Sequence, residues 1–107
     1  MIWHVQYTER ANADLQSIYN HIAHVLLAPE TAKNQAERIM DAADALEHMP
    51  LRHQRCANEP WGSMGWRVMP VDNYVVIYYP NEHNMLVSIM RIMYGGRDIE
   101  AQLNMHG

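Results

Sequence analysis

Arginine dominates the basic residues of this sequence. Seven of its eight basic side chains are arginines, and Lys33 is the only lysine. The guanidinium group presents a rigid fork of donors that suits bidentate contacts to carboxylate or phosphate. The chain as a whole carries a formal net charge of -4, and an acidic protein lacks the many cationic contacts that non-specific nucleic-acid binding requires. We therefore expect local anion contacts and no direct sequence-specific binding to DNA.

One short segment gathers residues that could transfer a proton beside an anion. Arg52, His53 and Arg55 lie close together in the sequence. A histidine has a pKa near neutrality, so it can act as a general base at physiological pH. His53, between two arginines, could therefore act as a base beside a bound anion. A solvated loop without catalytic function is the alternative, and the sequence leaves both interpretations open.

Arg91 stands in an otherwise apolar segment. Strict strand alternation over residues 86–94 would place its side chain on the same face as Met93. A buried charge without a partner is too costly, so this arginine must be paired or must lie on an open face. We expect it on an open, partner-facing side of the sheet. The alternative is a buried ion pair with Asp98 or Glu100.

Length and composition predict one globular domain spanning residues 1–107. The hydrophobic fraction is 49% and the charged fraction is 19%, as in ordinary folded proteins. Cys56 is the only cysteine, so an intrachain disulfide is excluded. No apolar run approaches the roughly 20 residues of a membrane span, and the start of the chain lacks a signal-peptide pattern. We expect a cytoplasmic protein without membrane contact, cofactor or metal site.

Apolar spacing in the first half of the chain predicts a strand followed by two helices. Residues 2–7 alternate between two faces, as a half-buried strand does. Thr8 offers a helix N-cap, and apolar residues then recur at spacings of three and four until near Leu27. A second apolar stripe begins after Pro29 and stops before Pro50. Because the connection between the helices is short, we expect an antiparallel hairpin.

The second half of the chain predicts a loop and an antiparallel meander. Residues 50–65 contain proline and glycine without a sustained period, which indicates a loop. Strand candidates follow at residues 66–71, 74–79 and 85–94, separated by short turn sequences. Residues 98–103 are short enough for a helical turn or a loose tail. The order of elements fits an α/β (α+β) domain with the helix hairpin packed on one face of the sheet.

Four segments in this order, spread over nearly the whole chain, carry a family resemblance. They are residues 7–18 after the first strand, 45–50 closing the second helix, 65–67 opening a strand, and 73–79 running towards 91–98. Together they resemble the RelE/ParE toxins of bacterial type II toxin–antitoxin pairs. The resemblance implies the RelE-like fold and a growth inhibitor that a cognate antitoxin neutralises. It leaves two chemistries open, since RelE-like members cut mRNA in the ribosome and ParE-like members block DNA gyrase.

The resemblance also suggests which residue would hold phosphate if the chain were a nuclease. Arg67 falls where nuclease-type members carry a phosphate-binding arginine. A structural arginine that bonds loop carbonyls, Glu59 or Asp72 is the alternative. Nuclease-type members carry lysines shortly before this arginine, whereas residues 58–64 here contain no cation. The phosphate-binding arginine of the nuclease-type members therefore has a counterpart here, but the lysines before it do not.

A second departure concerns the region after the last strand. Nuclease-type members carry an arginine there, followed by a tyrosine. If Gly95 or Arg97 takes the first place in this chain, Ala101 or Leu103 takes the second, and neither is a tyrosine. Substitute groups would be His53 and Tyr94, so a nuclease here would use Arg67, Arg97, Tyr94 and His53.

Both departures favour a ParE-like, non-nuclease toxin directed at DNA gyrase. The alternatives are a RelE-like endonuclease that acts on mRNA in the ribosome, and a degenerate module that binds an antitoxin without being toxic. Methionine is common at adaptable binding surfaces. For the surface that meets the antitoxin or the target, we therefore predict the contact residues Arg91, Met93, Met69 and Arg67.

Overall fold

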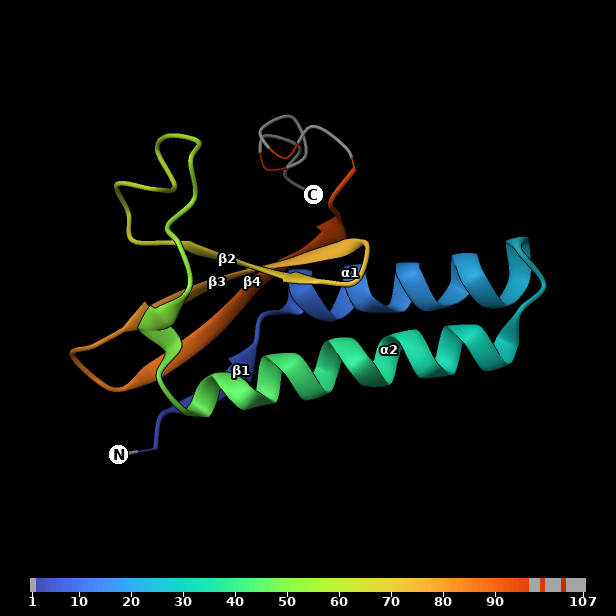
Figure 1. The fold of residues 1–107 in the computed structure, drawn as a ribbon, viewed down its shortest axis with the longest axis horizontal. Coiled ribbons are helices and arrows are strands. Elements are labelled where there is room, and N and C mark those ends of the chain that lie inside the picture. The colour runs from blue at the N-terminus through green and yellow to red at the C-terminus, as the bar shows by residue number, and fades with distance from the viewer. Residues whose placement is uncertain (1, 97–98, 100–102, 104–107) are drawn as a thin grey trace.

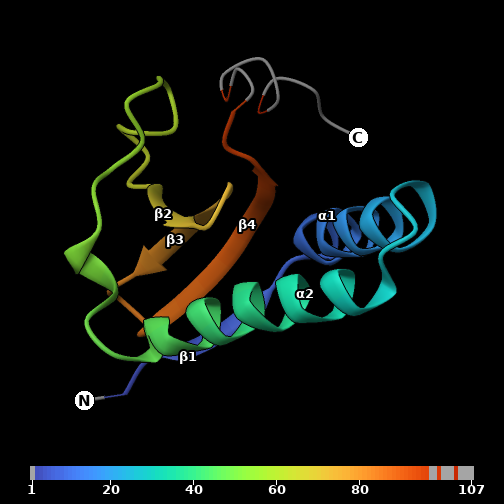
Figure 2. The ribbon, with the colours of Figure 1, turned by 45° about the vertical axis from the view of Figure 1, so that its right-hand side comes forward.

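The computed structural model describes residues 2–96, 99 and 103, and its elements follow the predicted order. Helices α1 (Glu9–Asn20) and α2 (Pro29–Asp44) form an antiparallel hairpin on one face of a sheet, as Figures 1 and 2 show from two directions. The strands of that sheet are β1 (His4–Tyr7), β2 (Arg67–Val71), β3 (Tyr74–Asn81) and β4 (Leu86–Tyr94). The predicted α+β architecture is therefore confirmed. The predicted turn at residues 98–103 lies mostly outside the described residues.

The helix hairpin begins and turns where its sequence signals lie. Thr8 is the N-cap of α1, because its Oγ1 accepts a hydrogen bond from the Ala11 N–H at 3.1 Å. The helix continues as a π-helical turn over His21–Val25, close to the predicted end. Pro29 opens α2, whose buried stripe consists of Ala32, Ala36, Ile39 and Ala43. In the described part of the chain, no helix is long and apolar enough to cross a membrane.

The sheet has the order β1-β4-β3-β2, so the strand that comes last in the sequence lies inside it. β4 pairs with β1 in parallel and with β3 in antiparallel orientation, and β3 pairs with β2 to complete the predicted meander. The core lies between this sheet and the hairpin. Its fully buried members include Ile39, Leu46, Val76, Tyr78 and Ile89.

A bulge in β4 changes which side chains face the helices. Tyr78 pairs with Ile89 but Ile77 pairs with Arg91, so the register shifts between these two pairs. An extra residue in one strand reverses the alternation beyond it. Ile92 consequently joins the core under the helices, whereas Met93 packs on the other face with Ile77. The uninterrupted alternation predicted for residues 86–94 is therefore wrong after Ile89.

The sheet face opposite the helices carries a second apolar cluster. Val75, Ile77 and Met93 are buried there, with Cys56 and the partly buried Trp61 packed on them. The covering residues belong to the segment predicted as a loop, which is bound to the sheet where the Cys56 N–H donates to the Trp66 carbonyl at 2.8 Å. This face of the sheet is therefore partly covered by the chain's own loop.

Candidate functional site

Arg67 holds the loop that precedes β2. It is the first residue of β2 and lies opposite Tyr78 in the sheet. Its Nη1 donates to the His53 carbonyl at 2.6 Å and to the Leu51 carbonyl at 3.2 Å. Its Nε is buried and has no hydrogen-bond partner among the described residues. These contacts match the structural alternative for Arg67, in which the arginine bonds loop carbonyls, and they reduce the donors available for phosphate.

His53 lies next to Arg67, but its ring is turned into the protein. The ring meets Tyr78 edge-on, with centroids 6.2 Å apart. Its Nε2 is buried without a hydrogen-bond partner in the described part of the chain. Burial, together with the neighbouring Arg52 charge, lowers the pKa of His53 below its usual value. The imidazole is therefore neutral at physiological pH, and its buried nitrogen does not reach solvent.

A polar hollow of about 360 Å³ adjoins Arg67. Arg55, Arg67 and His83 line it, together with residues of the segment that precedes β2 and of the turn between β3 and β4. His53 is not among the residues that line it. The two arginines of the hollow could accept an anion, although the Glu82 carboxylate also lines it. Among its described lining residues it contains no lysine.

Tyr94 lies at the far end of the sheet from Arg67. β3 lies between the two residues: Tyr94 of β4 pairs with Tyr74, and Arg67 of β2 pairs with Tyr78. Tyr74 and Tyr78 are four residues apart, which corresponds to roughly 13 Å along the strand. Tyr94 is 47% exposed, and its ring meets that of Tyr74 edge-on. Arg97 lies outside the described residues. The structure therefore brings His53 and Arg67 together, but not Tyr94.

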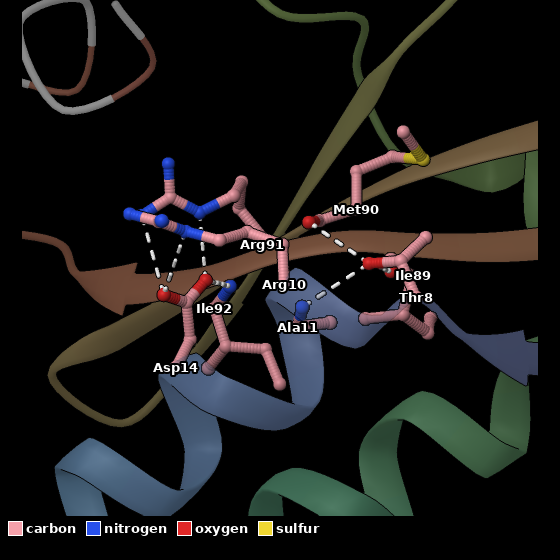
Figure 3. A network of polar contacts seen from close by, with 8 residues as sticks. All are labelled: Thr8, Arg10, Ala11, Asp14, Ile89, Met90, Arg91 and Ile92. Atoms are coloured by element: carbon pink, nitrogen blue, oxygen red, sulfur yellow. Dashed lines mark hydrogen bonds and ion pairs between the residues drawn. The ribbon is translucent and has the colours of Figure 1, made fainter. Parts of the chain in front are cut away.

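Arg91 is bound to helix α1. Its Nε donates to Asp14 Oδ2 at 2.7 Å and its Nη2 donates to Asp14 Oδ1 at 3.2 Å, with both side chains 13% exposed (Figure 3). The Ile92 N–H donates to the same carboxylate at 3.0 Å. Arg91 therefore does not lie on the open face that we expected, because its side chain is mostly buried against Asp14 of α1. The suggested alternative partners, Asp98 and Glu100, lie outside the described residues.

Asp14 is the residue that sequence reasoning missed here. It precedes Leu15 on α1, at the margin of the apolar stripe that packs against the core. An acidic residue at such a margin, combined with a single arginine in an apolar strand, is a signal for a partly buried ion pair. That signal was present in the sequence. Because the helix and the strand are far apart in the chain, the sequence did not indicate that these two residues meet.

A groove of about 500 Å³ runs between α1 and the end of β4. Asp14 and Arg91 line it on one side, and Leu26 and Tyr94 contribute exposed side chains, 59% and 47% exposed respectively. Met93 also lines the groove, although it is only 3% exposed. This surface combines apolar side chains with an ion pair, as protein-binding surfaces often do.

The predicted contact methionines offer little surface to a partner. Met69 is 4% exposed and packs in the core under the helices, and Met93 belongs to the cluster on the opposite face. Met69 is buried because the helices cover its face of β2, and Met93 is buried because the loop residues cover its face of β4. Their roles as contact residues stay predictions, as do those of Arg67 and Arg91.

The described residues thus form a mixed sheet with a helix hairpin on one face and a sparse set of cationic groups beside it. Residues 5–99 match the family model described as ParE toxin of type II toxin-antitoxin system, parDE. The chain belongs to this ParE toxin family. No curated protein matches the chain.

Solved structures share the fold at low sequence identity. A chain in the structure of the chromosomal ParDE toxin–antitoxin system of Pseudomonas aeruginosa is 23% identical in sequence, with a TM-score of 0.71. The match covers 87% of the present chain and 96% of that chain. The RelBE2 toxin–antitoxin complex of Mycobacterium tuberculosis is 19% identical, with a TM-score of 0.63 over 88% and 99% of the two chains. The archaeal RelE–RelB complex of Pyrococcus horikoshii is 18% identical, with a TM-score of 0.60 over 92% and 100%. The RelE-like fold is thereby shown.

Proposed function

We propose that this ParE-family toxin acts on DNA gyrase, does not cut RNA itself, and is neutralised by a cognate antitoxin. The observation that carries the proposal is the set of hydrogen bonds made by Arg67, the best candidate for binding phosphate. Its guanidinium group already bonds the Leu51 and His53 carbonyls. No lysine lies in residues 58–64, directly before it in the chain.

The chemistry of RNA cleavage explains why this arrangement favours binding over cutting. Attack by a 2′-hydroxyl group requires a base, an acid for the leaving oxygen, and cations that stabilise the charged phosphorane. Arginine has a pKa above about 12 and is a poor proton donor or acceptor. The Nε2 of His53 is buried. Tyr94 is on β4, beside the end of β3 that is far from Arg67. The described residues therefore do not converge on one scissile bond.

Partner binding is supported by the structural neighbours. The P. aeruginosa structure is of a ParDE system, and the M. tuberculosis and P. horikoshii structures are toxin–antitoxin complexes. The groove between α1 and β4 gives the present chain a surface on which a protein segment could lie. A cognate antitoxin is therefore the expected partner, and DNA gyrase is the expected target.

Two assays run in parallel test the proposal. Purified protein should inhibit gyrase-dependent supercoiling of relaxed plasmid and should leave mRNA intact on programmed ribosomes. Adding the antitoxin should restore supercoiling. Ribosome-dependent mRNA cutting that is lost in Arg67→Ala, but kept in the exposed control Arg38→Ala, would overturn the gyrase assignment.

The RelE-like alternative has one observation in its favour. Arg55, Arg67 and His83 line the same polar hollow, and a phosphate placed there would meet two arginines and a histidine, with the Glu82 carboxylate also in the lining. If this hollow were catalytic, His83→Ala would reduce mRNA cutting as much as Arg67→Ala does. The same ribosome assay therefore decides between the two functions.

A further inference from the structure

The segment that follows α2 is held by hydrogen bonds at every residue. Each backbone carbonyl from Glu47 to Leu51 accepts one, at distances of 2.6–3.2 Å. In chain order, the donors are the Trp3 N–H, the Arg52 side chain, the Arg52 N–H, the Tyr78 hydroxyl and the Arg67 side chain. Connecting segments are usually the more mobile parts of a protein, whereas this one is fixed to the sheet by β2 and β3. Its exposed side chains are therefore presented in one conformation.

Met49 has a backbone conformation that folding alone does not explain. Its φ is 49° and its ψ is 53°, in the left-handed region that disfavours residues with a large side chain. Its side chain contributes little to the core, because the residue is 72% exposed. Strained backbone of this kind is common at functional sites. An exposed apolar side chain on a fixed, strained backbone indicates a residue that contacts a partner.

Two hollows meet at Leu51. One has a volume of about 390 Å³ and is lined by Trp3, Met49, Pro50, Leu51 and Arg52. The other is the polar hollow of Arg55 and Arg67, which Leu51 also lines. A largely apolar hollow is thus continuous with one that contains two arginines. Tryptophan, methionine and arginine are residue types that are enriched at protein–protein contacts.

The charge of this surface differs from that of the whole chain. Residues 48–67 contain three arginines and one carboxylate, whereas the chain has a net charge of -4. That carboxylate, Glu59, accepts hydrogen bonds from the N–H and the hydroxyl group of Ser63. Glu82 lines the polar hollow from the turn between β3 and β4. The arginines outnumber these carboxylates, so the surface is complementary to an acidic partner.

The apolar part of the surface favours a protein over a nucleic acid as the partner. Single-stranded nucleic acids are bound by many cations and by exposed aromatic rings on which bases stack. Here Met49 and Leu51 are the exposed side chains, and Trp3 is half-buried. Two hollows are also too small for a symmetric dimer, because a stable interface uses roughly 20–30 residues of each partner. The surface therefore suits an anchoring contact with a larger protein.

We infer that this surface binds an acidic segment of the target protein, with an apolar side chain between Trp3 and Met49 and a carboxylate beside Arg55. The inference rests on the proposed function, and it specifies which part of the toxin meets gyrase. Arg67 is a positioning residue, because it fixes the Leu51 carbonyl. The surface shares no lining residue with the groove between α1 and β4.

Replacing Met49 with asparagine tests the apolar contact. Asparagine tolerates the left-handed conformation, so Met49→Asn removes the apolar side chain and keeps the fold. Leu27→Asn is the matched control, because Leu27 has a φ of 54° and is 80% exposed, at the other end of α2 (Figure 1). With purified gyrase holoenzyme as the probe, Met49→Asn should weaken binding at least tenfold. Leu27→Asn should leave the affinity within twofold, and equal effects of the two variants would overturn the inference.

A charge reversal tests the polar hollow. Arg55→Glu should weaken gyrase binding at least tenfold at low salt, and less at high salt because mobile ions screen the repulsion. Lys33→Glu makes the same change of charge at an exposed position of α2, and should leave the affinity within twofold. Equal losses in both variants would mean that net charge, and not this surface, attracts gyrase. That result would overturn the inference.

Methyl signals of labelled methionines keep the inference testable if a variant fails to fold. In the wild-type chain, saturation of gyrase protons should attenuate the methyl signal of Met49 strongly and that of Met40, which is exposed on α2, weakly. Attenuation of Met49 no stronger than that of Met40 would overturn the inference while leaving the proposed function standing. No binding of gyrase by the wild-type chain would overturn both. Loss of antitoxin binding in Met49→Asn, with gyrase binding unchanged, would assign the surface to the antitoxin and would also overturn the inference.

Discussion

Tyr78 illustrates how one core side chain ties the sheet to the loop that contains the candidate site. Its side chain is fully buried, and its hydroxyl donates to the Pro50 carbonyl at 2.6 Å. Pro50 is itself buried at the start of the segment that leads to His53 and Arg67. Burial raises the pKa of Tyr78 to about 12, although the Arg67 and Arg52 charges act in the opposite direction. The protonated phenol is therefore favoured in the folded state.

This shift predicts a loss of stability at alkaline pH. The folded pKa lies above the ordinary value near 10, so the contribution of Tyr78 is complete below pH 10 and declines as pH rises towards 12. One pKa unit corresponds to about 1.4 kcal/mol, so the loss from this group reaches about 2 kcal/mol at pH 12. Urea unfolding from pH 8 to 12 should show a steeper decline for wild type than for Tyr78→Phe. Parallel declines would contradict the assignment.

At the scale of elements, the contact between α1 and β4 depends on the ion pair of Asp14 with Arg91. The Asp14 carboxylate accepts from two nitrogens of Arg91 and from the Ile92 N–H (Figure 3). Arg91→Glu would be a simple surface test only if this residue were exposed. In this structure it would place two carboxylates together. Binding experiments with that variant would therefore mix folding effects with partner effects.

Removing the carboxylate should destabilise the fold. Asp14→Ala should lower the free energy of unfolding by about 3 kcal/mol, because a partly buried arginine and a backbone N–H each lose the Asp14 carboxylate as an acceptor. The exposed Glu37→Ala on α2 is the control, expected within about 0.5 kcal/mol of wild type. In a double-mutant cycle with Arg91→Met, the second change should recover part of the loss. Additive losses would show that the two side chains are not coupled.

The sequence located the elements well, because apolar spacing reports which face of a helix or strand is buried. Thr8 and Pro29 marked helix starts for local reasons that need no tertiary contact. The bulge in β4 left no such mark, and it moved Ile92 and Met93 to unexpected faces. The site was also only partly predictable. Whether Arg67 bonds a phosphate or the Leu51 carbonyl depends on how an aperiodic loop folds back, and no local pattern records this.

At the scale of the whole molecule, membership of the ParE family predicts an effect on cells. Inducing this chain alone in bacteria should slow growth, and co-expressing the product of the adjacent reading frame should restore it. Asp14→Ala, if it unfolds at the growth temperature, should remove the toxicity. Growth counts and soluble protein levels should be measured together. Normal growth with abundant soluble wild-type protein would favour the degenerate, non-toxic alternative.

The place of β4 inside the sheet has a consequence for the order in which the molecule is made. β1, the helix hairpin, β2 and β3 all leave the ribosome before β4, yet β4 alone joins β1 to β3. Contacts between segments so distant in the chain form late, because a long loop must close first. During synthesis, the apolar side of α1 therefore remains without the strand against which it packs. A partial chain that lacks β4 cannot acquire the finished shape, so a translating ribosome carries no complete toxin until that strand has emerged.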